Sequence, residues 1–260
     1  MENKLNELDG KEWIKFTKSW FKIAAKSRTK EQKDHPAKYP EELVEEFVAF
    51  FTKTGQTVLD PFVGVGSTIV GAEHIGRHGI GIELNPNFFA VAQERVSPDA
   101  RLILGDARQQ LAQIEDESID YIMTSPPYWN ILRKKRGHSD SQHTGRVREG
   151  LALYYSEDQN DLGNIDDYNR FIDELDGIFR QCADKLKRGK YMTIVIQNFR
   201  NDDGHYMTLA WDLAQRISAY CPFEGERIWL QEDKKLGIWG FRSSFILNIH
   251  HHYCLIFRKR

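Results

Sequence analysis

The stretch TVLDPFVGVGST, residues 57–68, decides the fold that the sequence predicts. Its first residues are β-branched or apolar and predict a short strand, and a helix is expected over 67–76. Gly64 and Gly66 between them allow a tight turn and a close approach of backbone to a ligand. The glycine spacing is not GxGxxG and no Lys precedes the Ser-Thr pair, so neither a dinucleotide fingerprint nor a P-loop is indicated. Asp60, before the turn, opposes phosphate but suits a cationic ligand.

Strands and helices alternate along most of the chain around this stretch. Further strands are expected over 79–83, 101–104, 118–124, 191–197, 226–231 and 244–257, and helices over 11–28, 41–51, 87–96, 166–188 and 207–220. Such alternation predicts an α/β fold with a mostly parallel sheet covered on both faces. No helix separates the last two strands, so they are expected to form an antiparallel pair at one edge.

Composition limits the class of protein. The chain has 260 residues, 40% hydrophobic and 28% charged, which indicates a single domain over 1–260 with a helical extension over 1–34. The net charge of -2 leaves only local basic patches to hold a nucleic acid. Three scattered cysteines, a polar N-terminus and the lack of a long apolar run favour a soluble protein of a reducing, cytoplasmic compartment.

Three acids are expected at the carboxyl ends of successive strands: Asp60, Glu83 and Asp106. Open α/β sheets bind ligands at that edge, and an acid at the second strand end typically accepts hydrogen bonds from ribose hydroxyls. A ligand with an amino acid cation, a ribose and an adenine amine would satisfy all three acids, which indicates S-adenosylmethionine. The alternative is that each acid caps the turn or helix that follows it.

The segment TSPPYW, 124–129, follows the fourth strand at the same edge. Proline lacks an N–H, so Ser125 and Pro126 present acceptors on a rigid turn, and Pro127 stiffens it further. Two acceptors that hold both protons of a nucleobase amine would free its lone pair for attack on a sulfonium methyl. Tyr128 offers a face on which a flipped-out base can stack. The alternative is a double-proline turn with its aromatic residues in the core.

The segment 130–164 is long, basic and poor in apolar residues, and loops of this length are usually functional or disordered. The triplet His250–His252 could place two imidazoles on one strand face, but no acid or cysteine stands at ligand spacing, so no metal site is predicted.

Several motifs together resemble the DNA amino-methyltransferases. VLDPFVGVGST is similar to that family's cofactor motif, and SPPY at 125–128 to its catalytic motif. HPAKYPEELVEEFV, from His35, resembles an N-terminal cofactor motif, and IGIELNPNFFAVAQERV a second-strand motif. HHHYCLIFRK resembles the late strand, with His251 where the family usually has Glu. The cofactor half comes before the catalytic half, whereas many SPPY enzymes have the opposite order.

The resemblance implies a class I methyltransferase (Rossmann-like) fold, a three-layer sandwich with a mostly parallel seven-stranded sheet and an antiparallel final strand at its edge. It also implies which residues contact S-adenosylmethionine. They are His35, the second proline of the HPAKYP motif (Pro40), Asp60, Pro61, Phe62, Gly64, Gly66, Ser67, Thr68, Glu83, Leu84, Asp106 and Ala107. Ser in the catalytic motif is associated chiefly with cytosine N4, so that target is expected, with adenine N6 as the alternative. A regulatory subunit without catalysis is the alternative of another class. The resemblance makes double-stranded DNA the expected partner. Segment 130–164 is expected to contact it, with Arg133, Lys134, Lys135 and Arg136 on phosphates and Arg146 or Arg148 on bases, and a solvated loop is the alternative. A cognate restriction endonuclease is a further possible partner, and both a monomer and a homodimer are compatible with the sequence.

Overall fold

The computed structural model describes residues 3–23, 39–129, 160–201 and 203–260. Within them, one large sheet has the order β1-β9-β10-β6-β5-β2-β3-β4. Its strands are β1 (Trp20–Lys22), β2 (Thr57–Asp60), β3 (His78–Glu83), β4 (Arg101–Leu104), β5 (Ile119–Thr124), β6 (Leu186–Ile196), β9 (Phe223–Leu230) and β10 (His251–Arg258). A short hairpin of β7 (Phe199–Arg200) and β8 (Tyr206–Met207) stands apart from it. The predicted α/β sheet is therefore present, with one strand more than the seven expected.

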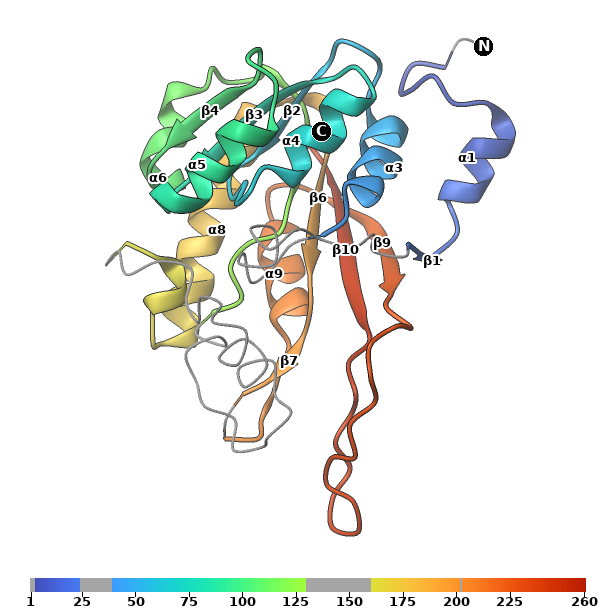
Figure 1. The fold of residues 1–260 in the computed structure, drawn as a ribbon, viewed down its shortest axis with the longest axis vertical. Helices are drawn as coiled ribbons and strands as arrows, with labels where there is room; N and C mark the ends of the chain where they lie inside the picture. The colour runs from blue at the N-terminus through green and yellow to red at the C-terminus, as the bar shows by residue number, and fades with distance from the viewer. Residues whose placement is uncertain (1–2, 24–38, 130–159, 202) are drawn as a thin grey trace.

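Helices cover both faces of this sheet (Figure 1). The helices are α1 (Gly10–Phe16), α3 (Glu41–Phe51), α4 (Ser67–His74), α5 (Pro86–Arg95), α6 (Ala107–Gln110), α8 (Tyr168–Lys185) and α9 (Leu209–Ile217), with 3-10 turns at Leu111–Gln113 and Leu162–Asn164. None of the helices within the described ranges is both long and apolar enough to cross a membrane.

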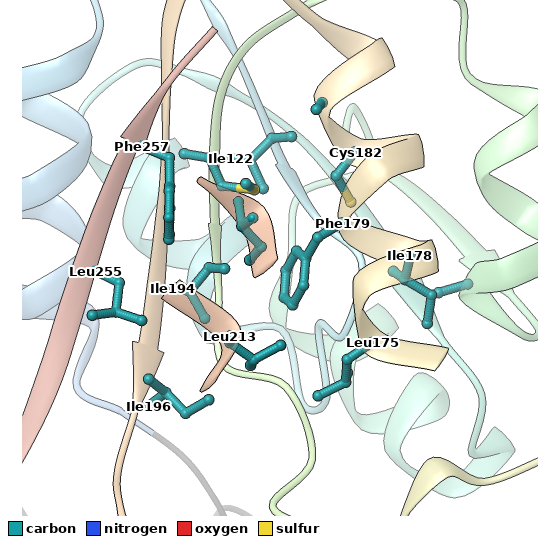
Figure 2. Close-up of a cluster of buried hydrophobic side chains, with 14 of the residues drawn as sticks. Ile122, Leu175, Ile178, Phe179, Cys182, Ile194, Ile196, Leu213, Leu255 and Phe257 are labelled. Atoms are coloured by element: carbon teal, nitrogen blue, oxygen red, sulfur yellow. The ribbon is translucent and has the colours of Figure 1, made fainter. Parts of the chain in front are cut away.

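The core on one face forms between α8, α9 and the central strands. Phe171, Leu175 and Phe179 recur at four-residue spacing along α8 and are fully buried. Figure 2 shows Phe179 directed toward Ile194 of β6, with Leu175 beside Leu213 of α9. The opposite face is covered by α3, which buries six of its eleven side chains. With both faces covered, the sheet edge is where polar groups can reach solvent.

Two predictions about the sheet are corrected by the strand pairing. The final strand, β10, is antiparallel as expected, but it lies between β6 and β9 rather than at the edge. The edge beyond β9 belongs to β1, which pairs in parallel with residues 228–230. Strand β6 also begins at Leu186, five residues before the predicted start, directly after α8.

The helix predicted over 11–28 is wrong in its extent. Helix α1 begins after a capping box between Asp9 and Glu12 and ends at Phe16. The following residues are extended because Phe21 inserts into the apolar cluster of α3 while the backbone of β1 pairs with β9. Sheet pairing overrides the amphipathic spacing here.

Candidate active site

The predicted acids meet at one edge of the sheet. Asp60 ends β2 and Glu83 ends β3, and the register pairs these two strands in parallel. Strand β4 pairs with β3 up to Leu104, two residues before Asp106. Strand β5 pairs with β2 on its other side and delivers Ser125 to the same edge. The spatial convergence expected from parallel strands is therefore present.

The turn after β2 is held against β3 by its backbone. Gly64 and Gly66 have φ values of 55° and 87°, a region that L residues other than glycine adopt at a cost. The Val63 N–H donates to the Ile82 carbonyl at 2.9 Å. A Cβ on Gly81 would stand 2.8 Å from a Val63 methyl carbon, so the glycines of β3 allow the turn to lie close.

Asp60 is enclosed beneath this turn and is only 2% exposed. Its Oδ1 accepts from the Phe62 N–H at 2.9 Å and from the Thr124 hydroxyl at 2.5 Å. Its Oδ2 accepts from the hydroxyls of Tyr39, at 3.2 Å, and Thr68. Burial raises the pKa of Asp60, and these donors oppose that rise. Asp60 therefore joins four segments, and Thr124 connects it directly to the strand that precedes SPPY.

Tyr39 was not predicted as a site residue, because the motif indicated the proline that follows it. Its buried hydroxyl lies between Asp60 and Thr68, and burial raises its pKa well above the usual value. Its place one residue before the proline that caps α3 was the available signal. His35, predicted from the same motif, falls outside the described residues.

Glu83 stands at the next strand end, and its carboxylate is less enclosed. Its Oε2 accepts from the Gly64 N–H at 2.8 Å, and its Oε1 from the Asn85 N–H at 2.7 Å. Each carboxylate oxygen has two lone pairs, so each keeps one for another donor. Burial raises the pKa of Glu83 to about 7, against the effect of these two backbone donors. Glu83 therefore retains acceptor capacity at the ligand-binding edge.

Asp106 has a different set of partners. It caps α6 by accepting from the Arg108 N–H at 2.9 Å, and it pairs with the Arg108 guanidinium at 2.7 Å. Arg108 also pairs with Glu174 of α8 at 2.9 Å and donates to the Asn160 carbonyl. The capping expected as the alternative reading is present here, and Arg108 occupies much of the carboxylate's acceptor capacity.

A pocket brings the cofactor and catalytic motifs together. Eight predicted site residues line it: Pro61, Phe62, Glu83, Leu84, Asp106, Ala107, Ser125 and Pro127. Eight further residues line it that sequence reasoning did not single out: Ile82, Asn85, Phe88, Gly105, Asn160, Asp161, Leu162 and Ile178. The predicted residues within the described ranges that do not line it are Pro40, Asp60, Gly64, Gly66, Ser67, Thr68, Pro126 and Tyr128. Two of the three predicted acids, together with Asp161, thus share one cavity with the Ser125 turn.

Aromatic side chains pack against the SPPY turn on the side away from the pocket. The hydroxyls of Ser125 and Tyr128 share a hydrogen bond, and burial raises the pKa of Tyr128. The Tyr128 ring is 9% exposed and meets the His252 ring edge-on at 6.4 Å. Trp129 has a φ of 42° and packs against Tyr168 at 5.3 Å. A positive φ at a tryptophan is rare and indicates that tertiary packing fixes the turn.

His252 is a second residue that the sequence did not connect to the site. It is packed between Trp229, at 5.2 Å, and Tyr128, and burial lowers its pKa to about 3. The ring is therefore neutral near pH 7. No group of three His, Cys, Asp or Glu side chains suited to a metal ion is found in the ranges that the structure describes.

The chemistry of the pocket fits a nucleoside-bearing cofactor. Glu83 offers two oxygens to a hydroxyl pair, and apolar side chains such as Leu84, Phe88 and Leu162 offer walls for a planar base. The DNA contacts predicted from Arg133, Lys134, Lys135, Arg136, Arg146 and Arg148 lie outside the described residues and stay predictions.

Known proteins show similarity to separate parts of the chain. The family model described as DNA methylase matches residues 1–94. Type II methyltransferase M.HpaI of Haemophilus parainfluenzae is 39% identical over 70 residues, 27% of this chain and 22% of that protein. Type II methyltransferase M.MthZI of Methanothermobacter thermautotrophicus is 27% identical over 148 residues, 54% of this chain and 38% of that protein. The matches thus span well under half the length of these curated relatives.

The fold is shared more widely than the sequence. An rRNA methylase structure from Streptococcus thermophilus superposes with a TM-score of 0.50 at 12% identity, covering 86% of this chain and 99% of that one. This likeness confirms the predicted Rossmann-like fold of the methyltransferases. The DNA methylase match over 1–94 and the similarity to type II methyltransferases support the resemblance to the DNA amino-methyltransferases that the motifs indicated.

Proposed function

We propose that this chain transfers a methyl group from S-adenosylmethionine to the exocyclic N4 amine of a cytosine flipped out of double-stranded DNA. The observation that carries the proposal is the shared pocket, where Glu83 and Ser125 line the same cavity. A ligand held at Glu83 and an amine held at Ser125 would therefore be neighbours.

Glu83 is proposed to bind the ribose of the cofactor. Its two free lone pairs suit two adjacent hydroxyls, each of which donates one hydrogen bond. Phe62, Leu84 and Ala107 are proposed to enclose the apolar parts of the cofactor. S-adenosylmethionine supplies a methyl group activated by its sulfonium charge.

The SPPY turn is proposed to hold the amine. The Ser125 hydroxyl and the Pro126 carbonyl serve as acceptors, since proline contributes no backbone N–H of its own. Holding both amine protons positions the nitrogen and frees its lone pair, so that transfer depends mainly on orientation and preorganised charge. The hydrogen bond between Tyr128 and Ser125 fixes the hydroxyl in place.

The choice of cytosine N4 rests on Ser125, which resembles the cytosine-associated form of the motif. Adenine N6 is the rival target. In the motif associated with adenine N6, the first residue is more commonly an aspartate or an asparagine. Mapping the modified bases in DNA from cells that express the protein decides between them. Modified cytosine supports the proposal, and modified adenine alone overturns the choice of target.

Transfer itself is tested with tritiated S-adenosylmethionine and unmethylated duplex DNA. Label is expected in the DNA with the wild-type protein and a loss of at least tenfold with Ser125→Ala. The matched control is Ser218→Ala, an exposed serine at the end of α9, and this variant should transfer normally. Absence of transfer to any nucleic acid favours the alternative of a cofactor-binding regulatory subunit.

Segment 130–164 is proposed to contact the DNA backbone. Replacing Arg133, Lys134, Lys135 and Arg136 together by Ala should weaken duplex binding and lower the dependence of log affinity on log salt, because fewer counterions are released. Unchanged affinity and salt dependence would remove this segment from the DNA interface.

A further inference from the structure

A long arm leaves the sheet between its last two strands. Residues 231–250 connect β9 to β10 and project away from the body of the molecule (Figure 1). Because β9 and β6 each pair antiparallel with β10, β9 runs in the same direction as β6. The arm therefore leaves from the edge at which the strands deliver the pocket residues.

The arm has its own hydrogen bonds. At its base, the Gln231 N–H donates to the His250 carbonyl at 2.8 Å. In the middle, the Asn248 side-chain oxygen accepts from the Gly237 N–H at 2.9 Å and from the Trp239 indole at 3.0 Å. At the tip, a turn closes on the Gly240 carbonyl. The arm is thus shaped before any partner binds.

The outer part of the arm exposes large apolar side chains. Ile238 and Phe245 are 84% and 83% exposed, and Leu236 and Phe241 are 76% and 71% exposed. The charged residue within 236–247 is a cation, Arg242, and the acids of the arm stop before this part. Exposed apolar clusters of this kind mark interaction surfaces, and this one carries no negative charge to repel phosphate.

The base of the arm contacts the proposed catalytic turn. His252, two residues beyond the arm, packs against the Tyr128 ring. The carbonyl of the neighbouring His251 accepts from the Gln197 side chain at 2.6 Å, which ties the arm to the end of β6. A macromolecule that presents a base to the pocket at this sheet edge therefore also lies within reach of the arm.

We infer that residues 231–250 form a DNA-binding arm whose apolar tip inserts against the bases of the duplex beside the flipped-out base. This inference rests on the proposed function. Extrusion of a base leaves unstacked neighbours, and proteins that distort duplexes commonly insert Phe, Leu or Ile between base steps. Phe241, Phe245 and Ile238 supply such side chains, and Arg242 supplies a contact to phosphate.

The test measures binding, separately from catalysis. The double variant Ile238→Ser/Phe245→Ser is compared with wild type for binding to a fluorescein-labelled mixed-sequence duplex, in the presence of S-adenosylhomocysteine. Duplex affinity should fall on the order of tenfold, because the stacking contacts are lost. The control Ile14→Ser removes an exposed apolar residue of α1, 73% exposed, and should leave affinity unchanged. Thermal unfolding should match wild type in both variants.

The arm has two distinct chemical roles that can be separated. Ile238→Ser/Phe245→Ser should keep the salt dependence of binding, whereas Arg242→Ala should lower its slope by about one unit. Equal duplex affinity in wild type and the double variant overturns the inference. A change from dimer to monomer in sedimentation, without a change in DNA affinity, would assign the arm to a second copy of the chain instead.

The inference and the proposed function fail in different ways. Loss of duplex binding in the arm variant, with no methyl transfer by wild type, would support the arm and overturn the methyltransferase. Wild-type transfer with unchanged binding and transfer in the arm variant would overturn the arm alone.

Discussion

The network around Asp60 and the pocket around Glu83 lie at the same sheet edge but differ in what surrounds the carboxylate. Asp60 is 2% exposed and accepts four hydrogen bonds from the protein. Glu83 accepts two and lines the pocket. An acid at a strand end can therefore hold the protein together or bind a ligand, and the number of protein donors around it indicates which.

The largest expected effect is on stability, at Asp60. Asp60→Ala removes the acceptor of four buried donors, so the free energy of unfolding should fall by about 3 kcal/mol or more. Glu83→Gln keeps the shape of the Glu83 side chain, so this variant should change the free energy of unfolding by no more than about 1 kcal/mol. Urea denaturation of both variants measures the difference. Equal losses in the two variants would abolish the distinction between the two acids.

The next effect is on cofactor binding, at Glu83. Glu83→Gln leaves one oxygen in place of two, so the Kd for S-adenosylmethionine should rise on the order of tenfold at pH 8. The Glu83 carboxyl, with a pKa of about 7, protonates as the pH falls, so wild-type affinity should weaken below pH 7. The Gln variant should lack this pH dependence. Calorimetric titration between pH 6 and 8 measures both.

The stability of the ligand-free protein should respond to pH in the opposite direction. The pKa of Glu83 is raised from 4.5 to about 7 in the folded state. Between pH 4.5 and 7, the folded protein therefore holds a proton that the unfolded chain has released. This contribution is fully present below pH 4.5 and is lost as the pH rises through 7. Glu83→Gln should flatten this part of the profile. An unchanged profile would show that Glu83 is solvated in the free protein.

The alternation of strands and helices was enough to predict the sheet, because each element follows a clear period or a glycine turn. The helix over 41–51 was predicted to the residue. The failures involve contacts between distant segments. The pairing of β1 with β9 joins residues about 200 positions apart and cannot be seen in the local pattern of 11–28. The same holds for the place of β10 inside the sheet.

At the site, the motifs identified the strand ends and the turns, but not which side chains face the cavity. The sequence assigned both Asp60 and Glu83 to ligand binding, since each ends a strand of the same sheet. Their difference arises from Tyr39 and Thr124, which approach Asp60 from separate segments. Asn160 and Leu162 line the pocket from the end of the segment 130–164, and no motif marks them.

A fourth prediction concerns the connection between the two motifs. Thr124→Val removes the hydroxyl that joins Asp60 to the end of β5, and it should cost about 1 kcal/mol of stability. If this connection positions Ser125, the transfer rate should also fall several-fold while cofactor affinity stays the same. Thr68→Val is the matched control, because Thr68 bonds to the other oxygen of Asp60. A similar loss of rate in both variants would indicate a general loss of order instead.

The smallest expected effect is at Tyr128, which contacts Ser125 from behind the pocket. Tyr128→Phe keeps the ring packed against His252 and removes the hydroxyl that bonds to Ser125. The stability of the folded protein should change by about 0.5–1.5 kcal/mol, the usual net value of one hydrogen bond. The kcat should fall about threefold with KM for DNA unchanged, because the hydroxyl orients an acceptor without binding the base. A rise in KM with an unchanged kcat would instead place the Tyr128 hydroxyl in contact with the substrate.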